Sequence, residues 1–171
     1  MITDCINFIK AKLAEVGIAK IYDDESSESA FKNGTYAAII RQTEEPLEYD
    51  GSKVAYTDVF DKGVRIYHIR MYMHRLTLLV RFAATSEALA EINREKFLLK
   101  LGTGFADRED YRIEVEGARA GHVTDKSILG TGAMKDAALT FTGGIYVQKV
   151  VRLLTDVDTG GEIIIPNREG T

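Results

Sequence analysis

A single cysteine, Cys5, is the only thiol in the chain of 171 residues. One thiol excludes an internal disulfide framework and a zinc site built on several thiolates. The charge is also modest, since 26 acidic and 22 basic side chains leave a formal net charge of -4. The chain therefore lacks the basic footprint that usually accompanies nucleic-acid binding. A protein that touches DNA without gripping it is still compatible with this charge.

The sequence has no long apolar run and no leader pattern. Its longest apolar runs fall far short of the roughly 20 residues that a membrane-spanning helix needs. Met1 leads directly into an amphipathic pattern that contains Asp4 and Asn7, which is not the pattern of a signal peptide. We therefore expect no membrane segment and a cytoplasmic location by default. The length predicts one domain over residues 1–171 that buries roughly 70% of its unfolded surface.

What the chain does contain is one long stretch of β-forming residues, Val64 to Ala84. It has no Gly, Pro, Asn or Asp, and it is rich in β-branched, aromatic and other apolar side chains. Its apolar positions are odd-numbered from Tyr67 to Met73 and even-numbered from Leu76 to Phe82. A strand changes faces only through a bulge, a bend or a turn, so we expect such a feature near His74.

The length of this stretch has a further consequence. One continuous strand of this extent would span roughly 60–65 Å, whereas a globule of this size has a radius of gyration of roughly 15–16 Å. The strand must bend over the core or extend beyond it. Its second half is typical of a core strand, and its first half of an edge or arm that lies against another surface. The alternative is a bent, bulged strand in an ordinary monomer.

Two helices are predicted. Apolar residues recur at helical spacing from Ile2 to Val16, and Gly17 follows where a left-handed C-cap residue belongs. Either Thr3 or Asp4 is expected to cap the start of this helix. Ser86 is expected to cap a second helix, from Glu87 to about Leu101.

The remaining segments predict strands joined mostly as hairpins. Asp61-Lys62-Gly63 and Gly143-Gly144 are expected to be hairpin turns. Strands are predicted over 18–22, 35–43, 53–60, 111–116, 133–142, 145–154 and 162–165, with loops at 23–34, 44–52, 103–110 and 117–132, and with 155–171 as a C-terminal strand and tail. The predicted class is α+β, a mostly antiparallel β-sheet with a long bent hairpin, packed by two main α-helices.

No catalytic, cofactor-binding or metal site is predicted. Gly102-Thr103-Gly104 and Gly130-Thr131-Gly132 lack the residues that would continue a phosphate-binding loop. His68 and His74 would lie roughly 20 Å apart on one strand, too far for a shared metal. Cys5 has no histidine near it in sequence, which favours a packed or surface thiol.

The first half of the long stretch carries the candidate subunit-interface residues. Arg and Tyr are side chains that protein interfaces favour. The candidates are Arg65, Tyr67, Arg70, Tyr72 and His74. Because the chain is negative overall, we expect Arg65, Arg70 and Arg81 to face an acidic loop of a neighbouring copy, such as Asp23 to Glu28.

Three segments, together with the N-terminal helix, carry a resemblance to known proteins. They are RIYHIRMYMHRLTLLVRF, SEALAEINREKFLLKL and ALTFTGGIYVQKVVRLL. Their order resembles that of the tail-completion, or tail-terminator, proteins of long-tailed bacteriophages and prophages, over nearly the whole chain. The resemblance rests on element order and residue types, because the family has no catalytic signature to match.

The resemblance implies a non-enzymatic virion protein, made in the host cytoplasm, whose copies form a hexameric ring without a cofactor. The ring would cap the tail tube, contact the tail tube protein and the head-side connector protein, and pass DNA through its lumen without specific binding. A negative subunit suits that passage, because a strongly basic channel would bind the phosphates. The loops at 44–52 and 117–132 would be candidates to order on docking.

Two alternatives stay open at this point. One is another neck or tube-end protein of the same assembly. The other is a small α+β enzyme or ligand-binding domain, which predicts a concave pocket with a few convergent polar groups of perturbed ionisation.

Overall fold

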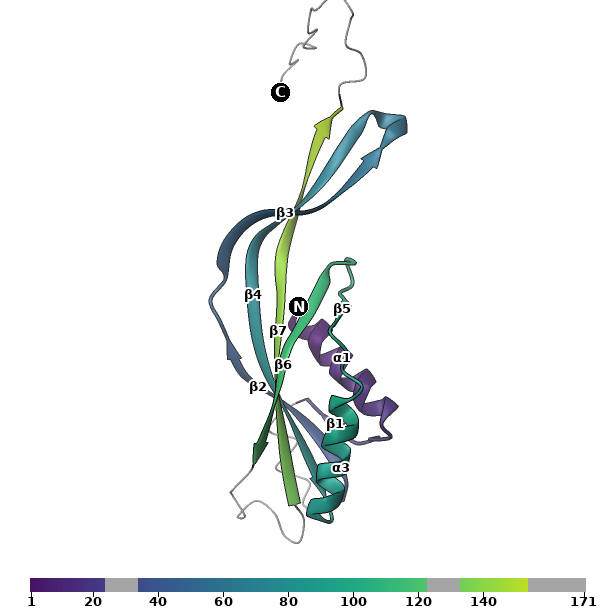
Figure 1. Ribbon diagram of the computed structural model, residues 1–171, viewed down its shortest axis with the longest axis vertical. Helices are drawn as coiled ribbons and strands as arrows, with labels where there is room; N and C mark the ends of the chain where they lie inside the picture. Colours follow the sequence, from purple (N-terminus) through teal and green to yellow (C-terminus); the bar gives the residue numbers. More distant parts are fainter. Residues whose placement is uncertain (24–33, 123–132, 154–171) are drawn as a thin grey trace, which may run out of the picture. The chain divides into compact units, whose positions relative to one another are not determined.

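The structure is a computed structural model that describes residues 1–23, 34–122 and 133–153 (Figure 1). Its described helices are α1 (Ile2–Glu15) and α3 (Glu87–Leu98), and a 3-10 turn, η1, covers Phe60–Lys62. The strands are β1 (Ile21–Tyr22), β2 (Tyr36–Glu44), β3 (Glu48–Val59), β4 (Val64–Ala84), β5 (Gly104–Ala106), β6 (Arg112–His122) and β7 (Ala133–Arg152).

All seven strands belong to one sheet. The strand order is β1-β2-β4-β7-β6-β5, and β3 pairs with β4 beside this path. The pair β1–β2 is parallel, whereas β2–β4, β5–β6 and β6–β7 are antiparallel. The predicted α+β class, with a mostly antiparallel sheet and a long hairpin packed by two helices, is confirmed.

The chain divides into two compact units. The first unit comprises residues 1–49 and 72–145, and the second comprises residues 50–71 and 146–171. Strands β3, β4 and β7 each begin in one unit and end in the other. The single domain over residues 1–171 stays a prediction.

The two helices end and begin largely where the sequence indicates. Gly17 follows α1 with φ +84°, the left-handed conformation that favours glycine. The Leu89 N–H donates to Ser86 Oγ at 3.3 Å, so the predicted cap of α3 is confirmed. The predicted side-chain cap of α1 is wrong, because the N-cap position is Met1 and no side chain caps it. The Asp4 carboxylate instead accepts a hydrogen bond from Arg108 at 3.1 Å.

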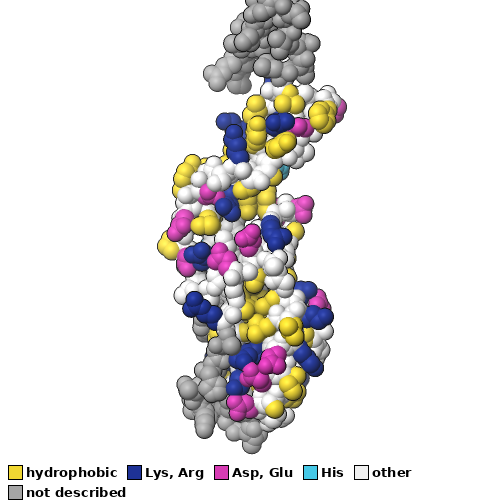
Figure 2. Space-filling model, viewed as in Figure 1, with side chains coloured by type: hydrophobic (Ala, Val, Ile, Leu, Met, Phe, Trp, Pro, Cys, Tyr) yellow, Lys and Arg dark blue, Asp and Glu magenta, His cyan; other side chains and the backbone are white. Residues whose placement is uncertain are grey.

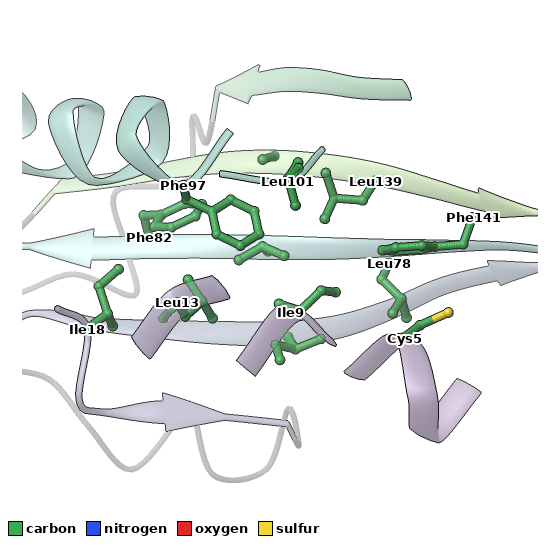
Figure 3. Packing of buried hydrophobic residues seen from close by; sticks show 14 of the residues in the cluster. Cys5, Ile9, Leu13, Ile18, Leu78, Phe82, Phe97, Leu101, Leu139 and Phe141 are labelled. Carbon is green, nitrogen blue, oxygen red and sulfur yellow. The ribbon is translucent and has the colours of Figure 1, made fainter. Parts of the chain in front are cut away.

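The core of the first unit lies between its helices and one face of its sheet (Figures 1 and 3). Leu76, Leu78, Val80 and Phe82 are all buried, as the even-numbered apolar positions of β4 predict. They pack against Cys5, Ile9 and Leu13 of α1, Phe97 of α3, and Ala137, Leu139 and Phe141 of β7. A smaller cluster, comprising Tyr36, Ala38, Ile40, Leu79, Ala83 and Met134, is buried separately from this core.

The hairpin predicted at Gly143-Gly144 is wrong. Strand β7 runs through both glycines from Ala133 to Arg152, and neither has a positive φ. An extended glycine is compatible with a strand when its missing side chain makes room for a neighbour. A Cβ on Gly143 would lie 2.7 Å from Met1 Sδ. The glycine therefore admits the thioether of Met1 and does not turn the chain.

Three other predicted loops contain strand. Strand β3 begins at Glu48, within the predicted loop 44–52, and accommodates Gly51 at φ +68°. Strand β6 continues to His122, through the first part of the predicted loop 117–132. Strand β5 lies in the predicted loop 103–110. The strand predicted at 162–165, the tail and residues 24–33 lie outside the described residues.

The register between β2 and β4 shifts three residues from His74. Arg41 of β2 lies opposite Leu78 of β4, whereas Thr43 lies opposite Thr77, so the extra residue is on β2. The irregularity predicted within β4 near His74 stays a prediction.

Candidate assembly surface

The second unit contains three antiparallel strand segments, which we call the ribbon. It comprises residues 50–59 of β3, 64–71 of β4 and 146–152 of β7, with β4 in the middle. The Leu153 N–H donates to the Gly63 carbonyl oxygen at 2.8 Å and ties the end of β7 to the start of β4. Among the described residues of this unit, none is buried. Three strands with a hydrophobic face are about the minimum for independent stability in water, so this unit has little stability of its own to spare.

One face of the ribbon is apolar. Alternation places Tyr67, Ile69 and Met71 together on β4, and the rings of Tyr56 and Tyr67 lie 6.3 Å apart. The odd-numbered residues of β7 join them, because Arg70 reaches the even-numbered Tyr146 on the opposite face. The apolar residues of this face are Val54, Tyr56, Tyr67, Ile69, Met71, Val147 and Val151, and the same alternation places Asp58, Arg65 and Lys149 among them.

The apolar face is largely open to solvent. The exposed fraction is 44% for Val54, 60% for Tyr56 and 43% for Val147. Figure 2 shows hydrophobic side chains at the surface here, beside Lys and Arg. Exposed apolar side chains that are contiguous mark interaction surfaces more often than isolated ones do.

Two of the predicted interface residues, Arg65 and Tyr67, are held by β3 of the same chain. Arg65 donates from Nε and Nη2 to the two carboxylate oxygens of Asp58, at 2.6 and 2.9 Å. Its Cζ also lies 4.3 Å from the centre of the Tyr56 ring. The ammonium of Lys53 lies 4.5 Å from the centre of the Tyr67 ring. The hydrogen bond from Arg65 lowers the pKa of Asp58 below its ordinary value of 3.8.

Arg70 is held in the same way on the other face of the ribbon. It donates to the carboxylate of Asp50 and is hydrogen-bonded to Tyr146. Hydrogen bonds from Ser52 and then from Arg70 lower the pKa of Asp50 below 3.8. Through these contacts Arg70 of β4 connects β3, at Asp50, to β7, at Tyr146.

The last two predicted interface residues, Tyr72 and His74, belong to the first unit. The Tyr72 ring meets the Tyr49 ring edge-on, with centroids 5.9 Å apart. His74 Nε2 lies 2.9 Å from Glu44 Oε1. Tyr49 is 70% exposed, so this aromatic pair is open on its β3 side.

The arginines expected to face a neighbour's acidic loop have carboxylate partners within the chain. Arg65 pairs with Asp58, Arg70 with Asp50, and Arg81 with Asp136. Most of the acidic loop, residues 24–28, lies outside the described residues. No local pattern in the sequence points to these partners, because Asp50 lies in a predicted loop and Asp58 in a predicted strand.

A polar hollow of about 520 Å³ lies in the first unit. Its lining residues are Glu45, Arg75, Thr77, Glu116, Gly117, Arg119, Ala138 and Thr140. Arg75 lies 3.1 Å from Glu116 and 3.3 Å from Glu45, and these carboxylates raise its pKa. A raised arginine pKa moves away from neutral pH, so Arg75 gains no capacity for acid–base chemistry.

The part of the chain that the structure describes contains no group of three or more His, Cys, Asp or Glu side chains placed to hold a metal ion. Of the two predicted settings of Cys5, packed or at the surface, the structure shows the packed one, and burial raises the pKa of its thiol to about 12. Neither described helix has the length and apolar character needed to cross a membrane.

Comparison with protein-family models and with curated proteins found no match.

Proposed function

We propose that the protein is a structural component of a phage tail that assembles into a ring, capping the tail tube and joining it to the head-side connector. The observation that carries the proposal is the ribbon. Its described residues form no buried core of their own, and its apolar face is open to solvent. A chain that builds such a surface has it covered in the working assembly.

A neighbouring copy is the covering partner that this proposal requires. The two edges of the ribbon differ in sequence, since β3 forms one edge and β7 forms the other. A contact between unlike surfaces of identical copies is heterologous, and it closes into a ring when the rotation between copies permits. The ring would number six copies, as the resemblance implies.

The net charge of -4 fits a ring that passes DNA. Six such subunits would repel the phosphate backbone more than attract it, so DNA would not be retained by counterion release. The proposal therefore requires no specific nucleic-acid site and no cofactor.

The first experiment measures mass and shape. Native mass spectrometry and negative-stain images of the purified chain should give closed rings with a mass that is a multiple of 19.0 kDa, six-fold in the proposed case. A monomer at every concentration up to the millimolar range contradicts the proposal.

A second experiment separates a terminator from another neck or tube-end protein. The rings are added to a phage tail tube protein while it polymerises. A terminator should stop tube growth and appear at one end of each tube. Rings that leave tube length unchanged would instead favour another position in the neck.

The polar hollow is the observation that favours the alternative of a ligand-binding domain. A small polar ligand would have to displace Glu45 or Glu116 from Arg75. Substituting Arg75→Ala should leave ring formation intact if the chain is structural, and that result would separate the hollow from the assembly.

A further inference from the structure

We propose that the polar hollow of the first unit binds a zwitterionic molecule of about the length of a dipeptide, with its ammonium group at Glu45 and its carboxylate at Arg119. The hollow combines a volume of about 520 Å³ with charged side chains of both signs. The inference goes beyond the proposed ring and does not depend on it. Because the hollow belongs to the first unit and the ribbon to the second, each can be tested without the other.

The floor of the hollow consists of small side chains on one face of the sheet. Thr140 and Ala138 alternate along β7 with core residues, so they lie on the face that points away from the helices. Gly117 lies opposite Thr140, and Arg119 lies opposite Ala138, so these residues of β6 share that face. Thr77 Oγ1 lies 3.4 Å from Thr140 Oγ1, which is long for two hydroxyl groups. Both hydroxyls can therefore bond a polar ligand.

Gly117 leaves part of this space empty. A Cβ on this residue would meet nothing within 4 Å. Its φ is not positive, so the backbone conformation does not require glycine here. The missing side chain therefore keeps open a volume that another residue would fill without strain.

Two acidic side chains share one basic partner at the rim of the hollow. Arg75 lies 3.1 Å from Glu116 and 3.3 Å from Glu45, so these three side chains carry one net negative charge at neutral pH. Glu116 is the extra residue of β6 at its register shift against β7, and a bulge of this kind re-aims a side chain. Glu45 has the longer contact and a half-exposed side chain, and exposed ion pairs stabilise little. The Glu45 carboxylate can therefore turn to a cationic group while Arg75 stays paired with Glu116.

Arg119 supplies the opposite charge. Its side chain lines the hollow and is exposed. Its guanidinium forms no ion pair with another residue of the described part of the chain. A guanidinium presents its N–H donors in a planar fork that matches the two oxygens of a carboxylate. A ligand carboxylate therefore fits at this end of the hollow.

The spacing of these charges determines the length of the ligand. Arg75 holds the Glu45 carboxylate close to Glu116, which directly precedes Gly117 on β6. Arg119 lies two residues beyond Gly117, which is about 7 Å along the strand. Two extended residues span at most about 7 Å. A dipeptide can therefore place its ammonium group and its carboxylate at the two ends, whereas the charges of a single amino acid lie too close together.

Isothermal titration calorimetry of the full chain at neutral pH tests the charge pattern with three probes. Dialanine carries both charges, N-acetyl-dialanine carries only the carboxylate, and dialanine amide carries only the ammonium group. We expect dialanine to bind with one molecule per chain. Each capped probe should bind about tenfold more weakly or worse, because it loses one charge-assisted contact.

Three variants locate the binding. Gly117→Leu should fill the hollow, and Arg119→Gln should remove the carboxylate partner, so each should weaken dialanine binding about tenfold or more. Arg112→Gln is the matched control, because Arg112 lies on the same strand, has a 61% exposed side chain and does not line the hollow. It should bind dialanine as the wild type does. Circular dichroism checks that the variants fold, and Arg119→Gln decides the matter if Gly117→Leu does not.

Three results would overturn the inference. The first is a lack of dialanine binding throughout the millimolar range. The second is a capped probe that binds as tightly as dialanine, which would assign a simple anion or cation site instead. The third is unchanged dialanine binding in the folded Gly117→Leu and Arg119→Gln variants, which would place the dipeptide elsewhere. The mass of the same preparations reports on the proposed ring separately, so either claim can fail while the other stands.

Discussion

Arg65 donates two parallel hydrogen bonds to Asp58, at 2.6 and 2.9 Å, across the hairpin of β3 and β4. The pair is bidentate, and such pairs fix orientation as well as charge. Arg65 also lies against the Tyr56 ring, so the pair supports the apolar face from within the chain. Arg65 and Arg70 therefore hold strands of the ribbon together within the chain. Their contact with a neighbouring copy stays a prediction.

Acid should loosen the ribbon. The pKa values of Asp50 and Asp58 are lowered from 3.8, so these pairs stabilise the folded form above about pH 4 and lose that contribution as pH falls through the lowered values. NMR titration of the carboxyl carbons should give midpoints below 3.8. In the Arg65→Gln variant the Asp58 midpoint should return toward 3.8. A wild-type midpoint at or above 3.8 would contradict the pairing.

The core of the first unit should be sensitive at Phe97. Its ring is fully buried and lies 5.4 Å from the Phe82 ring. We expect Phe97→Ala to lower the free energy of unfolding by about 3–5 kcal/mol. Leu99, two residues on, is 85% exposed, and Leu99→Ala should change it by less than about 0.5 kcal/mol. Urea unfolding checks both, and equal effects would place Phe97 outside the core.

Two glycines near β6 should differ sharply. A Cβ on Gly104 would lie 2.5 Å from the Ile113 carbonyl oxygen, and its φ of +157° is strained for other residues. Backbone cannot yield as a flexible side chain does, so Gly104→Ala should cost about 2 kcal/mol or more. A Cβ on Gly117 would meet nothing within 4 Å. Thermal unfolding should show Gly117→Ala near the wild type, and a similar loss in both variants would refute this assignment.

The pair of Arg81 and Asp136 should matter more than surface ion pairs do. Arg81 Nε lies 3.1 Å from Asp136 Oδ1, and the Asp136 residue is only 7% exposed. Asp136→Ala leaves a guanidinium without this partner and should cost about 3 kcal/mol. Arg108, whose side chain is 67% exposed, pairs with Asp4 at the surface, and Arg108→Ala should cost less than about 1 kcal/mol. Chemical denaturation compares the two, and a reversed order would contradict the burial argument.

Much of the fold could be predicted because local signals agreed with the packing. Ile9 and Leu13 share a helical stripe that ends at Gly17, and both are buried. The uninterrupted composition of Val64–Ala84 predicts one strand, and β4 runs through all of it. These signals are short-range and depend on few partners.

The wrong predictions have two causes: glycines that lie within strands were taken as signs of turns or loops, and some side-chain partners are distant in sequence. Gly143 looks like a turn residue, yet Met1 occupies the space that a side chain would fill, and no local pattern predicts that contact. Gly51 likewise sits inside β3 with a positive φ. The candidate interface residues were found from residue type, but their partners Asp50 and Asp58 depend on hairpin register, which composition does not determine.

The most direct test of the central claim is amide hydrogen exchange in residues 146–152 at several protein concentrations. If a second copy covers the ribbon, these amides should be better protected at high concentration than on dilution, while the core amides around Phe97 stay unchanged. Exchange that is fast at every concentration, or slow and independent of concentration, would contradict the claim that the ribbon is completed by another copy.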